Sequence, residues 1–280
     1  MGRKILAISL LFLVVVLAFS ACEGGLSPLA QEITDGAVQA LDSIISYRFE
    51  LTSTMDLTGE IEGEATEGEL TIFQTSELDL ANHKMHNLQT MVSAMTGTRD
   101  INTTTETYII DNTVYAVSDS SYPDITWTKT EIAEELWEQL NQINFELDIL
   151  EASTKVKVTG SETVDGVDCY VLEITPSEEH LWQLLIQQMG MASDTSTDVS
   201  EELLDELFHN YTAKQWIAKD SYFLIKMEVE MSVTLPPELT GNPDAEGETN
   251  IDTKLTVMTY DYNQPLSIEL PQEAEEAIEY

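Results

Sequence analysis

The chain has 280 residues and carries 51 acidic against 12 basic side chains, a formal net charge of −39 at pH 7. A field this negative repels nucleic acid phosphates and anionic lipid surfaces, so nucleic acid is excluded as a partner. The acidic residues are spread through the chain, which is typical of a solvated surface. Attraction of a cationic partner or of divalent ions is the alternative reading of the same charge.

The N-terminus has the order of a secretory signal peptide. A basic start and an apolar run over residues 5–19 precede the small pair Ser20-Ala21 and then Cys22. This cleavage region resembles the bacterial lipobox, although Phe19 stands where an aliphatic residue is usual. The resemblance implies cleavage before Cys22 and a lipid on its sulfur.

We therefore expect a signal peptide at 1–21, a lipidated N-terminus and tether at 22–27, and a single domain at 28–280. The alternative is an uncleaved membrane helix, but the apolar run is shorter than the ~20 residues of a comfortable span. Two or three lipid chains, at about 0.8 kcal/mol per buried methylene, would hold the protein firmly on the membrane. Its expected place is the extracytoplasmic face of the cytoplasmic membrane, in the cell envelope.

The first predicted element after the tether is an amphipathic helix over 28–45, with Ser27 as N-cap and Pro28 in the first turn. A strand with one wet face follows over 47–57. A Gly- and Glu-rich stretch at 59–68 predicts a turn before a less regular strand at 70–80. These are the apolar positions of the first strand: Tyr47, Phe49, Leu51, Met55 and Leu57.

The middle of the chain alternates between strand and helix patterns. Residues 82–100 are ambiguous between strand and loop, and 108–117 predict a hairpin around Asp111-Asn112. Apolar spacing predicts a helix over 131–150, with Thr128 and Glu131 as a capping box.

Strands at 155–159 and 167–174, joined through Asp165-Gly166, precede two further helical patterns. One begins at Ser177 and the other has an apolar stripe through Leu203, Leu207, Phe208 and Tyr211.

The strongest strand pattern covers 223–235, and a last pair is expected at 251–262 and 266–270. Strands with one wet face favour antiparallel pairing. The predicted fold class is α+β, a large curved antiparallel sheet wrapped around a few helices. The apolar positions of the strongest strand are Phe223, Ile225, Met227, Val229, Met231, Val233 and Leu235.

Several motifs in order resemble the LolA/LppX-like (LppX/LprA/LprG-type) envelope lipoproteins and carriers. They are Gly166 to Ile174 with its Tyr170 and Leu172, Trp216 to Met227, Tyr108 to Tyr115 followed by Trp127-Thr128-Lys129, and Tyr262 to Pro265. The resemblance implies a half-barrel around helices, with an apolar cavity that holds acyl chains. It implies no catalytic residues.

We therefore expect a cavity between the sheet and the helices that binds a hydrophobic or lipid ligand. The candidate wall residues share one parity of their strands: Phe49, Leu51, Met55, Phe223, Ile225, Met227 and Met231. Flexible methionines suit variable acyl chains, but a packed core explains them as well. The alternative function is thus a structural or sensory module with a packed core that meets an envelope protein partner.

No enzyme, cofactor or metal is expected. The sequence has no P-loop, nucleophile elbow, zinc-protease or dinucleotide fingerprint. His83 and His86 would fall on opposite faces of a strand, and His180 and His209 read as surface residues. Cys169, in a strand-like run, is expected to be a small buried core residue.

Overall fold

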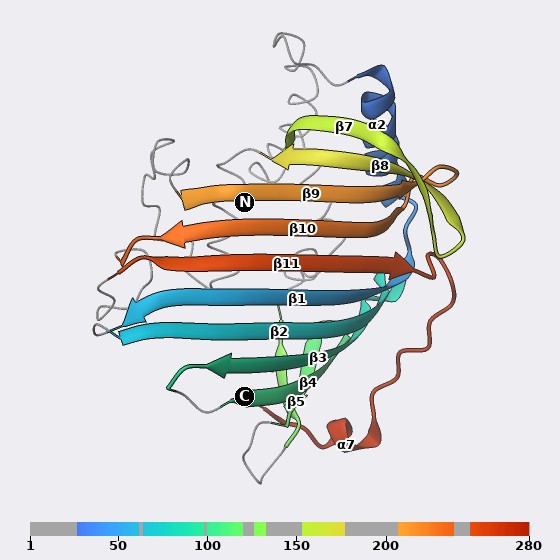
Figure 1. The fold of residues 1–280 in the computed structure, drawn as a ribbon. Helices are drawn as coiled ribbons and strands as arrows, with labels where there is room; N and C mark the ends of the chain where they lie inside the picture. The colour runs from blue at the N-terminus through green and yellow to red at the C-terminus, as the bar shows by residue number, and fades with distance from the viewer. Residues whose placement is uncertain are drawn as a thin grey trace, which may run out of the picture.

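The computed structural model describes residues 27–61, 64–97, 100–119, 126–132, 153–176, 207–237 and 247–279. These residues form one twelve-stranded sheet in the order β12-β6-β5-β4-β3-β2-β1-β11-β10-β9-β8-β7 (Figure 1). The strands are β1 Ser46–Ile61, β2 Glu64–Asp79, β3 Lys84–Met95, β4 Ile101–Ile110, β5 Thr113–Ser118, β6 Thr128–Glu131, β7 Ser153–Val164, β8 Val167–Pro176, β9 Phe208–Ala218, β10 Leu224–Leu235, β11 Thr249–Tyr260 and β12 Ile278–Glu279. The described α-helices are α2 Pro28–Leu41 and α7 Gln272–Glu275, and Leu80–Asn82 forms a 3₁₀ turn.

The sheet is curved and open, as expected. Neighbouring strands of the sheet pair antiparallel, except for β12 and β6, which form a short parallel pair. Strands β4 and β5 turn behind β1 to β3 in Figure 1, so the convex side faces the viewer. We call the concave side, which carries Tyr47 and Phe49 of β1 and packs against α2, the inner face, and the convex side the outer face.

Helix α2 begins where the sequence predicts and ends four residues early, at Leu41. The Ser27 hydroxyl accepts a hydrogen bond from the backbone N–H of Ala30 at 3.2 Å, which satisfies one of the free donors of the first turn. Ala30, Ile33 and Ala37 are at most 1% exposed and join the main core cluster with inner-face residues of the sheet. The helix is therefore held by its apolar face.

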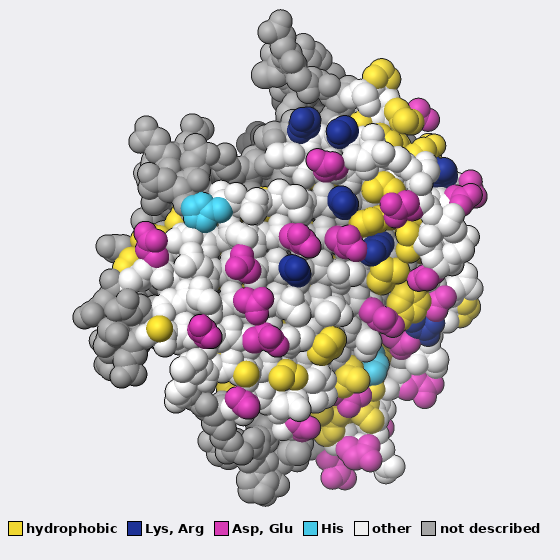
Figure 2. Space-filling model, viewed as in Figure 1, with side chains coloured by type: hydrophobic (Ala, Val, Ile, Leu, Met, Phe, Trp, Pro, Cys, Tyr) yellow, Lys and Arg dark blue, Asp and Glu magenta, His cyan; other side chains and the backbone are white. Residues whose placement is uncertain are grey.

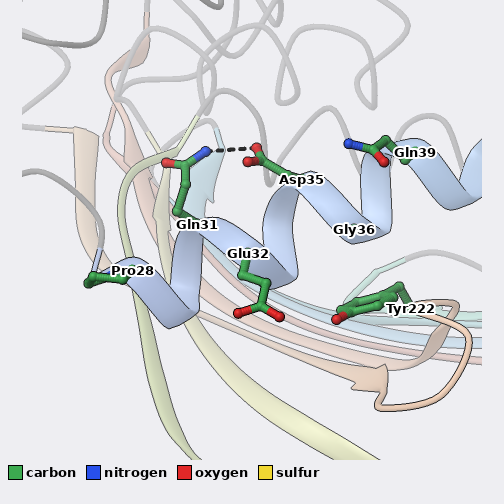
Figure 3. Close-up of a pocket in the computed structure, with 7 residues that line it drawn as sticks. All are labelled: Pro28, Gln31, Glu32, Asp35, Gly36, Gln39 and Tyr222. Carbon is green, nitrogen blue, oxygen red and sulfur yellow. Dashed lines mark hydrogen bonds between the residues drawn. The ribbon is translucent and has the colours of Figure 1, made fainter.

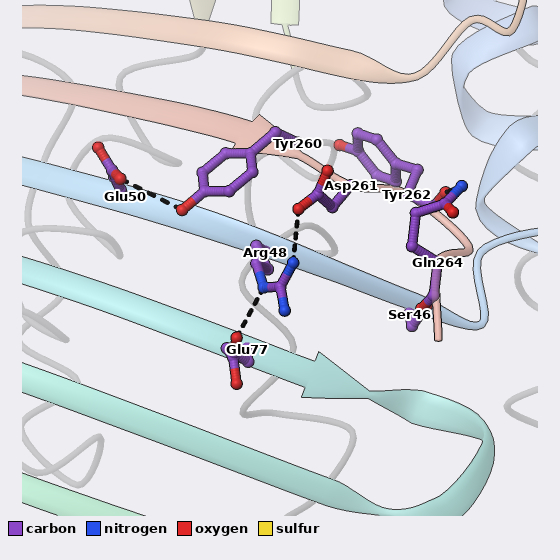
Figure 4. Close-up of polar contacts among 8 residues, drawn as sticks. All are labelled: Ser46, Arg48, Glu50, Glu77, Tyr260, Asp261, Tyr262 and Gln264. Carbon is purple, nitrogen blue, oxygen red and sulfur yellow. Dashed lines mark hydrogen bonds and ion pairs between the residues drawn. The ribbon is translucent and has the colours of Figure 1, made fainter. Parts of the chain in front are cut away.

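The N-terminal and C-terminal parts of the sheet join at β1 and β11, which lie about 200 residues apart in sequence and pair over eleven residues. Side chains reinforce this seam (Figure 4). Arg48 of β1 binds the carboxylates of Glu77 at 2.6 Å and Asp261 at 2.5 Å. The hydroxyl of Ser46 donates to the carbonyl of Gln264 at 2.7 Å. Both carboxylates raise the pKa of the Arg48 guanidinium.

Several local predictions were wrong. Gly59 and Gly68 lie inside β1 and β2 rather than in a turn, because the two strands pair until Ile61 meets Glu64. The predicted capping pair Thr128 and Glu131 lies in β6 instead, where the cross-strand ladder to β5 takes its backbone hydrogen bonds.

Tertiary pairing also overrides the helical spacing near residue 208. Phe208 and Tyr211 belong to β9, because this segment pairs with β10, Tyr211 with Met231 and Phe208, after a register shift, with Val233. Residues 266–270 are not a strand; the chain there is irregular and leads to α7 and β12. The ambiguous stretch at 82–100 contains strand β3.

The hairpins at Asp111 and at Asp165-Gly166 are confirmed. Asp111 (φ 53°) and Gly166 (φ 85°) adopt the left-handed backbone that such tight turns require. The predicted helices over 131–150 and from Ser177, the signal peptide and Cys22 lie outside the described residues, apart from Glu131 and Ile132.

Candidate functional site: the inner face of the sheet

The two faces of the sheet differ in charge along the same strands. Cross-strand register places five rows of side chains on the inner face of β1 to β4 and β11 (odd positions of β1, β3, β4 and β11, even positions of β2). The described rows that cross β1 at Tyr47, Phe49, Leu51, Ser53 and Met55 contain no Asp, Glu, Lys or Arg. Charged residues lie on the outer face instead, for example Glu50, Asp56, Glu69, Glu228 and Asp252 (Figure 2).

The inner face is apolar around β10, β11 and β1. Met227 pairs with Val257, which pairs with Leu51, and both Met227 and Val257 are 0% exposed. Two rows further along, Met231 and Met55 flank Thr253 and are half-buried. The half-buried Met231 and Met55 offer dispersion contacts to an apolar ligand, since flexible methionines adapt to different shapes.

Five of the seven predicted wall residues lie together on this face: Phe49, Leu51, Met55, Met227 and Met231. Phe223 lies in the β9–β10 turn, where its ring stacks on Tyr262 with centroids 4.5 Å apart. Phe223 thus lies at the end of the sheet, in contact with clusters on both faces.

Ile225 does not lie on the inner face, contrary to the prediction. The register shifts between Leu224, which pairs with Ile217, and Lys226, which pairs with Trp216. This bulge places one extra residue in β10 and reverses the alternation there. Ile225 is consequently buried in an outer-face cluster with Cys169, Val171, Trp216 and Ala218.

A second inner-face region, over β2 to β4, is polar but uncharged. Ser76 pairs with Asn87 and Asn87 with Thr107, while Gln74 pairs with Gln89 and Gln89 with Thr105. We call these six residues the polar band. Their signal was present in the sequence, as the weak alternation of 70–80 and the ambiguity of 82–100, but only the register shows that the six residues adjoin.

A shallow pocket of about 530 Å³ lies beside α2 (Figure 3). Gln31, Glu32, Asp35 and Gln39 of the helix line it together with the ring of Tyr222. That ring packs directly on Gly36, where an added Cβ would lie 2.6 Å from Tyr222 Cδ1. The pocket is polar and open, unlike the wall of an acyl-chain site.

The free cysteine is buried and His86 is paired. Cys169 is free and 0% exposed, and burial raises the pKa of its thiol. His86 Nε2 lies 3.0 Å from Glu106 Oε1, which also accepts from the Tyr108 hydroxyl at 3.0 Å. Desolvation, then the hydrogen bond to Glu106, raises the pKa of Tyr108 to about 12.

The described residues show neither a metal-binding cluster nor a membrane-spanning helix. They contain no group of three or more His, Cys, Asp or Glu placed to hold a metal ion. Their helices include none that is both long and apolar enough to cross a membrane.

The structure thus has an open, curved β-sheet, and the five described rows of its concave face carry no charged side chain. Residues 29–279 match a family described as a family of unknown function, DUF6612, and the chain belongs to this family. No curated protein matches the chain significantly.

Solved structures similar to the chain include the group that the sequence motifs resemble. LprF from Mycobacterium bovis is 14% identical with a TM-score of 0.44, covering 89% of this chain and 99% of its own. LppX from Mycobacterium tuberculosis is 12% identical with a TM-score of 0.42, covering 87% and 100%. A LolA superfamily protein from Nitrosomonas europaea is 12% identical with a TM-score of 0.22, covering 86% and 94%.

Proposed function

We propose that this protein is a lipid-anchored lipoprotein of the cell envelope that binds or carries a hydrophobic, acyl-chain ligand on the inner face of its sheet. The anchor is the lipid on Cys22, after removal of residues 1–21. The domain at 28–280 performs no covalent chemistry. Binding rests on removing the ligand's apolar surface from water, which is worth roughly 25 cal/mol per Å².

The observation that carries this proposal is the separation of charge between the two faces. A chain with 51 acidic residues has none in the five described inner-face rows across β1 to β4 and β11. The charged outer face of the alternating strands is sufficient to explain the solubility of the protein. The half-buried Met55, Met231 and Leu51 in addition leave part of the apolar wall exposed for contact.

Photo-methionine provides a direct test in the full-length, membrane-anchored protein. Its diazirine replaces the thioether at every methionine and captures whatever touches the side chain on irradiation. Met55 and Met231 report on the inner face, while half-buried Met258 lies on the outer face of β11 and serves as an internal control. We expect acyl-chain adducts on the peptides of Met55 and Met231 and none on that of Met258.

A second function is favoured by a different observation, an exposed apolar strip on the outer face. Phe73 of β2 is 50% exposed, and Leu88 and Val92 of the neighbouring β3 are 40% and 39% exposed. A structural or sensory module could use this strip to meet an envelope protein. In that case the photo-methionine adducts would be peptides, and the inner-face methionines would capture no lipid.

A further inference from the structure

We infer that the ligand is an amphiphile with an uncharged, hydrogen-bonding polar part, and that the polar band of the inner face binds that part. This inference rests on the proposed function and adds the chemical class of the head group. The polar band consists of Gln74 and Ser76 of β2, Asn87 and Gln89 of β3, and Thr105 and Thr107 of β4.

The polar band is compact and bordered by apolar rows. Strands lie ≈ 4.8 Å apart and alternate residues ~7 Å apart, so its six side chains cover about 10 by 7 Å, the size of a small polar head group. On one side lies the row of Leu78, Met85 and Ile109, and on the other Ile72 and Met91. Leu51 and Phe49 of β1 adjoin it at the edge that leads to the apolar wall.

Part of the hydrogen-bonding capacity of the polar band is used internally. Gln74 Nε2 donates to the hydroxyl of Ser76 at 3.2 Å, and that hydroxyl donates to Asn87 Oδ1 at 2.7 Å. The side chains of Gln89 and Thr107 have no hydrogen-bond partner among the described residues. Both are half-buried, so their donors and acceptors are available to a bound molecule.

A polar atom at the centre of the apolar wall is also unsatisfied. Thr253 is 6% exposed and lies between Met231 and Met55 on the inner face. Its hydroxyl is buried without a hydrogen-bond partner among the described residues. Buried polar groups are normally paired, so an orphan here indicates a partner from outside the described chain, such as an ester or hydroxyl oxygen of a ligand.

Charge decides the class of head group. The five described inner-face rows hold amides and hydroxyls but no Lys or Arg that could pair with a phosphate. Placing an unpaired charge against an uncharged, half-buried wall is strongly unfavourable, whereas a hydroxyl gains hydrogen bonds there. The negative field of the whole protein adds to the repulsion of anions.

The test uses the full-length lipidated protein in phosphatidylcholine vesicles that contain one of two photoactivatable probes. Both probes have the same diazirine-bearing acyl chain; one is a monoacylglycerol and the other a lysophosphatidylglycerol. Adducts are counted at the inner-face residues of β3 and β10, after digestion of the protein into peptides. We expect at least ~10-fold more adduct from the monoacylglycerol.

Two variants assign that preference to the polar band. Asn87→Leu with Gln89→Leu should reduce the ratio to about one, and Asn87→Thr with Gln89→Thr should restore most of it. Thr90→Val, on the outer face of the same strand, should leave it unchanged.

The outcomes separate the two proposals. Inner-face adducts that do not distinguish the probes, or a ratio unaffected by the leucine pair in a folded protein, would overturn the head-group inference alone. If neither probe gives adducts on the inner face, the proposed function is overturned together with the inference.

Discussion

The inner and outer faces of β10 are built from alternate residues of one strand, yet they differ sharply. Met227 and Val229 face inward and are 0% and 8% exposed, while Glu228 and Glu230 face outward beside β9 and β11. The chain therefore separates two environments across the thickness of a single sheet. The difference between the two faces should therefore appear when each is changed separately, and when a contact that joins elements of the sheet is removed.

The largest expected effect is that of a charge placed on the inner face. Met227→Asp should lower the free energy of unfolding by about 4 kcal/mol, because the site is fully buried and the described rows contain no cation to pair with the carboxylate. Glu230→Ala on the outer face should change it by less than ~0.5 kcal/mol. Urea denaturation of both proteins measures the difference, and equal losses would contradict the distinction between the faces.

The contact between α2 and the β9–β10 turn gives the next effect. Gly36→Ala should lower the free energy of unfolding by about 1–3 kcal/mol, because the new methyl group meets the ring of Tyr222. In a Tyr222→Ala background the same substitution should instead stabilise, by up to about 1 kcal/mol, because alanine is the better helix former. A double-mutant cycle by thermal unfolding detects this change of sign.

A smaller effect concerns pH and the outer face. The pKa of Tyr108 is raised to about 12 in the folded protein, against about 10 for an unperturbed tyrosine. The folded state therefore holds the phenol proton more tightly, and stability present below pH 10 is lost as pH rises towards 12. We expect a loss on the order of 1 kcal/mol after solvent screening. Tyr108→Phe should remove this part of the pH dependence, and parallel melts at pH 9 and 11.5 would show whether it does.

The smallest effect is expected at the seam between β1 and β11. Arg48→Gln removes ion pairs to Glu77 and Asp261 in which the Arg48 side chain is 31% exposed. Partly exposed pairs contribute little, so the loss should be below about 1 kcal/mol and should shrink further in 1 M salt. A loss that is larger, or independent of salt, would mean that the seam depends on this residue more than exposure indicates.

The sequence predicts β1 and most of β10 well because their inner positions are apolar almost throughout, Ser53 being the exception in β1. It fails at Ile225, where a bulge reverses the parity of one residue. It fails also at β3, where inner Asn87 and Gln89 are polar and outer Leu88 and Val92 are apolar. A period-2 pattern cannot indicate which parity faces inward when neither is clearly apolar.

The sequence by itself determined the strand periodicity, the Ser27 cap, the hairpin turns and the uncharged parity of β1, since each depends on residues close together in the chain. Only the tertiary structure decided that β1 pairs with β11, that Phe208 and Tyr211 join a strand, and that six polar side chains of β2, β3 and β4 lie together. These outcomes depend on cross-strand register between distant segments. Register is set by the burial of a whole face, so no local pattern contains it.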